Sequence, residues 1–272
     1  MRNEGSALGE FQLLVKAGAV QRRVIAALLM REVLTRYGRN NIGFLWLFVE
    51  PMLFTLVITA LWSATRTIHG SNIPIVAFAL TGYSSALVWR NMPGRCMRAV
   101  KPNMSLLFHR QVKIFDIYIS RILLESIGGC ASFVVLGLLF WSMDWMPAPE
   151  DAFQVLEGWL LLLWFGAALG MFIGSVAESV ELVEKLWPPF SYILFPLSGA
   201  AFIVETLPER MREVVLYLPI IHAVEYLREG FFGSMFHPHY DLQYLVLWNL
   251  GLTLAALSQV RRVGRGRIDG DD

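Results

Sequence analysis

IYISRILLESIGGCASFVVLGLLFW, residues Ile117 to Trp141, is an almost unbroken apolar run that carries only two charged side chains, Arg121 and Glu125. A helix needs about 20 largely apolar residues to cross the roughly 30 Å of hydrocarbon in a bilayer, and this run is longer. A helix is the expected conformation, because backbone groups in lipid must form their hydrogen bonds within their own segment. The run therefore predicts a membrane-spanning helix.

Five further apolar runs are comparable in kind. They cover Gly43 to Trp62, Ile73 to Trp89, Gly158 to Ala177, Leu186 to Val204, and Leu242 to Val260. Of the 272 residues, 56% are hydrophobic and 17% are charged, whereas soluble domains carry about a quarter charged residues. The sequence predicts an all-α polytopic membrane protein with six transmembrane helices between residues 43 and 260.

Lysine and arginine are distributed unevenly among the segments outside these runs. Seventeen lie before the first run, between the second and third, or after the last, and four lie in the alternate segments. Cytoplasmic segments carry the excess of positive charge, so both termini are predicted to be cytoplasmic. The expected organisation is a cytoplasmic N-terminal segment at 1–42, the six-span domain at 43–260 and a cytoplasmic tail at 261–272. The acidic connection Glu178 to Lys185 is also expected in the cytoplasm.

Three connecting segments are more than plain linkers. Val24 to Met30 is apolar but too short to span, and it fits a helix lying at the cytoplasmic interface. Residues 92–113 form a basic cytoplasmic loop with an apolar centre, Met104 to Phe108. The external segment 205–241 has residues typical of helix ends, so short re-entrant or interfacial helices are expected before the last span. These residues are Pro208, Pro219 and Gly230.

Three stretches together identify a family. The first is MREVLTRYGRNNIGFLWLFVEP, from Met30 to Pro51. The second is KPNMSLLFHRQVKIFDIYISRILLE, from Lys101 to Glu125. The third is LPIIHAVEYLREGFFG, from Leu218 to Gly233, which contains the pattern Pro-x-x-His-x-x-Glu. In order and placement they resemble the permease subunit of the capsular-polysaccharide ABC exporters, within the type-2 exporter family.

The resemblance implies a multi-pass subunit of the bacterial inner membrane with several partners. It implies a second copy of the chain, two ATP-binding subunits, and a periplasmic co-export protein that bridges to an outer-membrane exporter. The implied substrate is a lipid-linked, often acidic polysaccharide; membrane lipid is a further partner, and nucleic acid is not expected. The chain lacks the pattern G-x-x-x-x-G-K-[ST], so ATP and Mg are expected on the partner ATPase. We therefore expect a transport subunit with no cofactor of its own and no catalytic residues.

The basic loop between spans two and three is the expected contact with the ATPase. The resemblance favours a coupling helix whose apolar centre docks in a cleft of that partner, although an apolar stretch in a basic loop can also lie on the membrane. The residues expected to couple to the ATPase are Arg98, Lys101, Asn103, Leu106 and Leu107.

Residues before and inside the first span are candidates for the substrate entrance. Guanidinium groups near the inner leaflet can hold anionic lipid, or can receive the charged head of a lipid-linked glycan. The cluster with its family match favours the second function. These candidates are Arg31, Glu32, Arg36, Tyr37, Arg39 and Trp46.

Three charged residues lie inside predicted spans at similar depth. Glu50 precedes Pro51, so it marks either a kinked hinge at the channel entrance or a static pair between helices. Arg121 and Glu125 are one helical turn apart and can pair with each other, and Arg121 can also reach Glu50. A structural ion-pair network is favoured over direct contact with substrate.

Aromatic side chains are candidates for sugar contact, because their faces pack against the C–H faces of sugar rings. Packing and the interfacial belt are nevertheless the commoner roles of such residues in a membrane bundle. The aromatic candidates for the channel are Tyr83, Trp89 and Tyr226.

Other function classes fit less well. All five histidines lie outside the six runs and no G-x-S-x-G is present, which argues against an intramembrane serine enzyme. No inverted repeat is evident, which argues against an ATP-independent secondary transporter. No metal site is expected, because His237, His239 and Asp241 in one loop are only a weak signal. Within the exporter class, O-antigen glycan or teichoic acid is the alternative substrate, and the choice of capsule depends on the resemblance.

Overall fold

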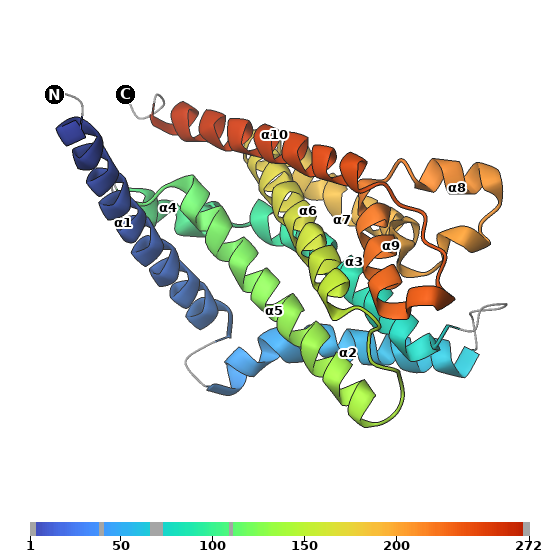
Figure 1. Cartoon of the computed structure of the whole chain (residues 1–272). Helices are drawn as coiled ribbons and strands as arrows, with labels where there is room; N and C mark the ends of the chain where they lie inside the picture. Colours follow the sequence, from blue (N-terminus) through green and yellow to red (C-terminus); the bar gives the residue numbers. More distant parts are fainter. Residues whose placement is uncertain (1–3, 38–40, 66–72, 109–110, 269–272) are drawn as a thin grey trace.

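The computed structural model describes residues 4–37, 41–65, 73–108 and 111–268, and these residues form helices and no strand (Figure 1). They confirm the all-α class. In chain order the elements are α1 (Glu4–Tyr37), α2 (Asn41–Thr65), α3 (Ile75–Met97), η1 (Lys101–Asn103), α4 (Met104–Leu107), α5 (Ile114–Ser142), α6 (Ala152–Ser179), α7 (Glu181–Phe195), η2 (Pro196–Ala200), η3 (Val204–Thr206), α8 (Glu209–Val215), α9 (Pro219–Phe232), η4 (Gly233–Met235) and α10 (Leu242–Ile268).

The six predicted spans fall on α2, α3, α5, α6, α7 together with η2, and α10. Among the described residues, α5 and α6 are the helices long and apolar enough to cross a membrane by length and composition. The crossing by the other four stays a prediction. The fifth predicted span, Leu186 to Val204, is not one straight helix: α7 has 15 residues, and η2 breaks at Gly199, where φ is 79°. Pro188, Pro189 and Pro196 account for this irregularity, because each removes a backbone donor.

The helix predicted to include Val24 to Met30 is much longer than the sequence indicated. The expected patch was Val24 to Met30, whereas α1 has 34 residues. No proline interrupts this segment, so one continuous helix forms. α1 lies against α5 (Figure 1): the Gln21 side chain donates a hydrogen bond to Asp116, and Val33 packs on Leu124. The contact fixes α1 beside the first turns of α5.

α6 is the central helix, and α3, α9 and α10 pack around it (Figure 1). Its close approach to α3 depends on glycines spaced by four residues, which share one helix face. A Cβ atom added at Gly170 would lie 3.1 Å from the backbone of Met92, and one at Gly174 would lie 2.7 Å from the Cβ of Cys96. A side chain at Gly174 would force a shift and one at Gly170 would crowd Met92, so these glycines allow the close approach of α3 and α6.

Segment 205–241, which the sequence predicts to be external and which we call the external segment, contains the expected short helices. α8 begins directly after Pro208 and α9 begins at Pro219, which confirms both predicted starts. The predicted end at Gly230 is wrong, because α9 continues to Phe232 and ends at Gly233, where φ is 52°. Gly230 is instead a packing position, since an added Cβ would lie 2.8 Å from the Gln154 side chain. α9 is largely buried against α6, so the external segment is an integral part of the fold.

Candidate functional site

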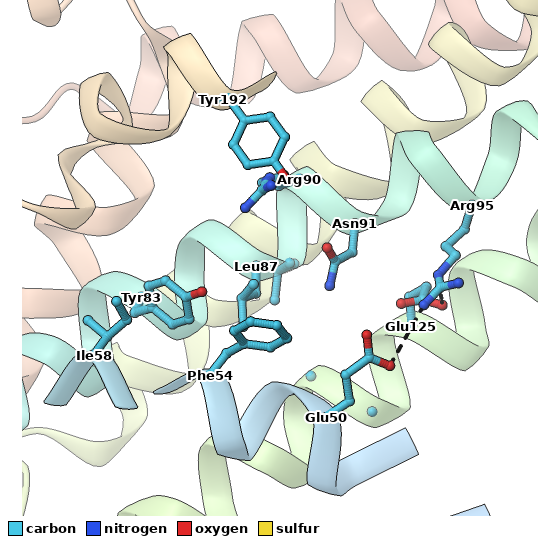
Figure 2. Close-up of a pocket in the computed structure, with 13 residues that line it drawn as sticks. Glu50, Phe54, Ile58, Tyr83, Leu87, Arg90, Asn91, Arg95, Glu125 and Tyr192 are labelled. Atoms are coloured by element: carbon cyan, nitrogen blue, oxygen red, sulfur yellow. Dashed lines mark ion pairs between the residues drawn. The ribbon is translucent and has the colours of Figure 1, made fainter. Parts of the chain in front are cut away.

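A cavity of about 440 Å³ lies between α2, α3, α5 and α7, and we call it the interhelix cavity (Figure 2). Most of the polar groups in its wall come from one face of α3, and α2 and α5 each add a glutamate. The lining residues are Glu50, Phe54, Ile58, Tyr83, Leu87, Val88, Arg90, Asn91, Arg95, Glu125, Gly128, Gly129 and Tyr192.

Arg95 holds the acidic residues of this cavity together. Its Nε lies 3.2 Å from Oε1 of Glu125 on α5, and its Nη2 lies 4.0 Å from Oε2 of Glu50 on α2 (Figure 2). The sequence predicted an ion-pair network here with Arg121 as its cation, and the structure adds Arg95 to it. Arg121 pairs with Glu32 of α1, with Nη1 3.0 Å from Oε1. The network therefore joins four helices through two arginines, and α1 is part of it.

Arg90 is a further cation of this cavity and was not among the residues predicted from the sequence. Its guanidinium carbon lies 4.0 Å from the centre of the Tyr192 ring, in the geometry of a cation–π contact (Figure 2). Tyr83 forms an edge contact with Phe195, with ring centres 5.6 Å apart. Tyr83, Leu87, Arg90 and Asn91 share one face of α3, so helical spacing from Tyr83 was the signal that could have found Arg90. This wall combines aromatic faces with positive charge.

A second cavity of about 320 Å³ lies between α1, α3, η1 and α5, and we call it the arginine cavity. Arg95 lines both cavities and so forms part of the wall between them. The Arg31 side chain donates a hydrogen bond to Oδ1 of Asn103. The lining residues are Arg31, Glu32, Thr35, Gly94, Arg95, Arg98, Pro102, Asn103 and Arg121. Two groups of predicted residues, those of the entrance and those of the coupling loop, thus meet here.

The residues of the predicted coupling loop do not all face outward. Asn103 is buried and donates from Nδ2 to the Ala99 carbonyl at 2.8 Å. Leu106 and Leu107 are half-buried and pack against the core, and their predicted contact with the ATPase stays a prediction. Met104 and Phe108 are the exposed apolar side chains of this loop, at 49% and 85%.

Lys101 connects this loop to the connection between α6 and α7. Its Nζ lies 3.2 Å from Oε2 of Glu184, and the hydrogen bond to this carboxylate raises the pKa of Lys101. The pair is exposed, so it contributes little to stability. Its value is positional, because it places the acidic connection next to the basic loop.

The remaining predicted residues lie away from the interhelix cavity or outside the described part. Trp89 is 2% exposed and packs in the core. Tyr226 lies on α9, where its hydroxyl donates to Oε2 of Glu157 at 2.7 Å. Trp46 is exposed on α2. Arg39 lies outside the described residues, as do the side chains of Arg36 and Tyr37.

His222 and Glu225, from the Pro-x-x-His-x-x-Glu pattern, fasten α9 to the chain that follows it. Glu225 is fully buried, and its Oε2 accepts a hydrogen bond from the backbone N–H of His239 at 3.1 Å. Nδ1 of His222 accepts from the N–H of Asp241 at 2.8 Å, and burial lowers the pKa of this histidine. The neutral ring thus donates from Nε2 to the Leu216 carbonyl. The pattern has a structural role that its spacing alone did not reveal.

Arg228 fastens the same helix to the break in the fifth predicted span. It is fully buried, and its guanidinium donates to the Phe202 carbonyl at 2.9 Å and to the Ala200 carbonyl at 3.3 Å. Its guanidinium carbon also lies 4.1 Å from the centre of the Phe78 ring on α3. These contacts satisfy carbonyls that the helix break leaves without a helical partner. One turn of α9 therefore holds α3, η2 and the segment after η2 in place.

Burial raises the pKa of Glu225 to about 7 from its usual 4.5, against the opposing effect of Arg228. The folded protein then binds more protons than the unfolded chain between these values, so stability falls as pH rises through that window, by on the order of 3 kcal/mol. We expect the melting temperature in detergent to fall between pH 5 and pH 7.5, and to fall less in Glu225→Gln. Glu213→Gln, at an exposed position, is the matched control. If the melting temperature of Glu225→Gln depended on pH as that of the wild type does, Glu225 would not be the group that titrates in this window.

The comparisons with known proteins agree with this architecture. The sequence model of the ABC-2 type transporter family matches residues 23–232. The chain is 43% identical over 248 residues to "Capsule polysaccharide export inner-membrane protein CtrC" of Neisseria meningitidis serogroup B, covering 91% of this chain and 94% of the relative. It is 41% identical to "Capsule polysaccharide export inner-membrane protein BexB" of Haemophilus influenzae, with the same coverage.

A more distant relative matches nearly the same length of this chain. "Polysialic acid transport protein KpsM" of Escherichia coli is 26% identical over 244 residues, which cover 89% of this chain and 94% of the relative. The matched family region includes the interhelix cavity, the arginine cavity and most of the external segment. The chain belongs to the ABC-2 type transporter family.

Proposed function

We propose that this chain is the permease subunit of an ATP-driven exporter that moves lipid-linked capsular polysaccharide across the bacterial inner membrane. The observation that carries the proposal is the similarity along nearly the whole chain to CtrC and BexB, both named for capsule polysaccharide export. In this proposal ATP and Mg bind to a separate ATPase, since the chain has no phosphate-binding pattern of its own.

The proposed topology has six spans with both termini in the cytoplasm. The distribution of lysine and arginine supports it, as does the apolar character of α5 and α6. The break at Gly199 fits the fifth span, because irregular backbone at membrane depth is tolerated where protein buries it. Buried carbonyls at that break receive hydrogen bonds from Arg228.

The interhelix cavity is the proposed part of the substrate path. Arg90 and Arg95 offer positive charge to acidic sugars, and the Tyr83 and Tyr192 rings offer flat apolar faces. The cavity is shared by α2 and α7, whose outward side chains are strongly apolar. Those side chains include Leu53, Val57, Leu186, Phe190 and Ile193. A second copy of the chain is the proposed cover for part of this surface, and lipid for the rest.

The proposed partners are two ATP-binding subunits on the cytoplasmic side and a periplasmic co-export protein that leads to an outer-membrane exporter. The loop around α4 is the proposed contact with the ATPase, because it exposes apolar side chains among basic residues. Lys101 of this loop pairs with Glu184, so a movement of the ATPase that shifts the loop would also reach the connection between α6 and α7.

Two experiments test the proposal together. The gene for this chain is deleted in its host, and the tagged chain is purified gently from the same host. We expect the deletion strain to lose surface polysaccharide and to accumulate it inside the cell. We expect the purified chain to carry one ATP-binding subunit per copy, identified by mass spectrometry. Normal surface polysaccharide in the deletion strain, with no ATPase retained after crosslinking, would refute the proposal.

A further inference from the structure

The arginine cavity is built from cations that converge from separate parts of the chain. Arg31 comes from α1, Arg95 and Arg98 lie on or just after α3, and Arg121 lies on α5, while Glu32 is the one acidic residue in the lining. Glu32 and Glu125 pair with two of these four guanidinium groups, which leaves a net positive charge at the opening. The cavity volume of about 320 Å³ falls within the range of small-molecule sites, about 300–1,000 Å³.

Two of these arginines are available to a ligand. Arg95 and Arg121 are committed to Glu125 and Glu32, at 3.2 and 3.0 Å. For Arg31 and Arg98, the described residues supply no carboxylate within ion-pair distance, and both residues are exposed. Arg31 is oriented by its hydrogen bond to Asn103, whose own amide is held by the Ala99 carbonyl. The site thus has fixed walls and two accessible guanidinium groups at its mouth.

The chemistry of the mouth matches a phosphate group on a lipid. Guanidinium groups bind phosphate through paired hydrogen bonds, which a single ammonium group cannot form. Leu34 lies one helical turn beyond Arg31 and is 47% exposed. Met30 directly precedes Arg31 and is 57% exposed. An interfacial helix exposes such residues to acyl chains while its arginines meet headgroups. A soluble anion would not explain these exposed apolar side chains next to Arg31 on α1.

We propose that the arginine cavity binds the phosphate of an anionic lipid headgroup, held by Arg31 and Arg98. The same chemistry has two sources, a membrane phospholipid or the lipid carrier of the exported glycan. In either case the phosphate links α1 to the loop that follows α3, because Arg98, Pro102 and Asn103 form the other wall. The inference rests on the proposed function only in placing α1 at the inner leaflet.

Native mass spectrometry of the whole complex, stripped of lipid in detergent, measures this binding directly. Dioleoylphosphatidylglycerol is the probe, and a neutral glucosyl diacylglycerol of the same chain length is its control. We expect Arg31→Gln with Arg98→Gln to lower the affinity for phosphatidylglycerol at least tenfold. The matched control, Arg22→Gln with Arg23→Gln, changes two exposed arginines of α1 outside the cavity and should stay within twofold. Equal binding by both double variants, or equal binding of the neutral lipid, would overturn the proposal.

Gly94 provides a second test that keeps all four arginines. It lines the cavity, and a Cβ atom added there meets nothing within 4 Å, so a side chain is tolerated. Gly94→Glu would place a carboxylate in the opening, and we expect it to bind phosphatidylglycerol at least fivefold more weakly than Gly94→Gln, which has the same size without charge. Equal affinity of the two variants would show that charge in this cavity does not bind lipid, which overturns the site.

Competition identifies the source of the phosphate. Lipid-linked glycan extracted from the host is added to the complex loaded with phosphatidylglycerol. Displacement supports a site for the glycan carrier, and retention of phosphatidylglycerol supports a site for a resident phospholipid. Both results support the phosphate site, and both are independent of export, so failure of the proposed function would be seen separately in the deletion strain.

Discussion

Replacing Phe108 with aspartate is expected to abolish export while the folded protein stays in the membrane. The side chain is 85% exposed directly after α4, so a charge there costs the isolated chain little. In an apolar cleft of an ATPase, the same carboxylate would lose its water without gaining a partner, which costs several kcal/mol. We expect surface polysaccharide to fall more than tenfold and the ATPase to be lost on purification.

Phe153→Asp is the matched control for Phe108→Asp. It makes the same change at a side chain that is 68% exposed, in the first turn of α6, and Figure 1 shows this turn far from α4. We expect near-normal export from it. A Phe108→Asp variant that retains both the ATPase and export would remove α4 from the interface.

Leu106→Asp separates docking from folding in the same loop. Because Leu106 is half-buried against the core, a charge there is expected to lower the melting temperature in detergent, which Phe108→Asp should leave within about 2 °C. This contrast tests whether Leu106 and Leu107 or Phe108 form the docking face. The sequence showed an apolar centre, but helical phase decides which of its side chains turn outward.

Long apolar runs made the helical class predictable, since their length and composition require helices in lipid. Prolines were equally reliable for the starts of α8 and α9, because a fixed φ suits the first helical turn. The length of α1 was missed, because its first half has only short apolar runs. The break at Gly199 was missed for the opposite reason: hydropathy stays high where the backbone changes direction.

Ion-pair partners were less predictable than the presence of a network. Spacing placed Arg121 one turn from Glu125, and nothing in the sequence indicated that Glu32 of α1 would also lie beside Arg121. Only the packing of α1 on α5 brings Glu32 within 3.0 Å of Arg121. The sequence placed Arg95 in the basic loop after the second predicted span. In the structure it lies on the last turn of α3, between Glu50 and Glu125. Tertiary contacts decide such pairs, and local spacing does not.

Replacing Arg95 with methionine is expected to cause the other large loss of export. Methionine keeps much of the length and apolar volume but removes the cation that lies between Glu50 and Glu125. The Glu125 side chain is 11% exposed, so losing this guanidinium destabilises the fold by about 1–2 kcal/mol, less than for a fully buried pair because Arg95 itself is 33% exposed. Glu50 is 43% exposed at 4.0 Å and contributes little to that loss. The exposed Arg262→Met on α10 is the matched control.

The double variant Arg95→Met with Glu125→Gln distinguishes a structural pair from a part of the substrate path. Glu125→Gln removes the carboxylate that has lost the Arg95 guanidinium in Arg95→Met. The melting temperature of the double variant is therefore expected to return to within about 2 °C of wild type. Export by the double variant is expected to stay below a tenth of the wild-type level, because Arg95 also lines the cavity where acidic sugars would need its charge. Recovery of export together with stability would show that Arg95 only holds α3 to α5. Export that stays low in a stable double variant places the guanidinium itself on the path.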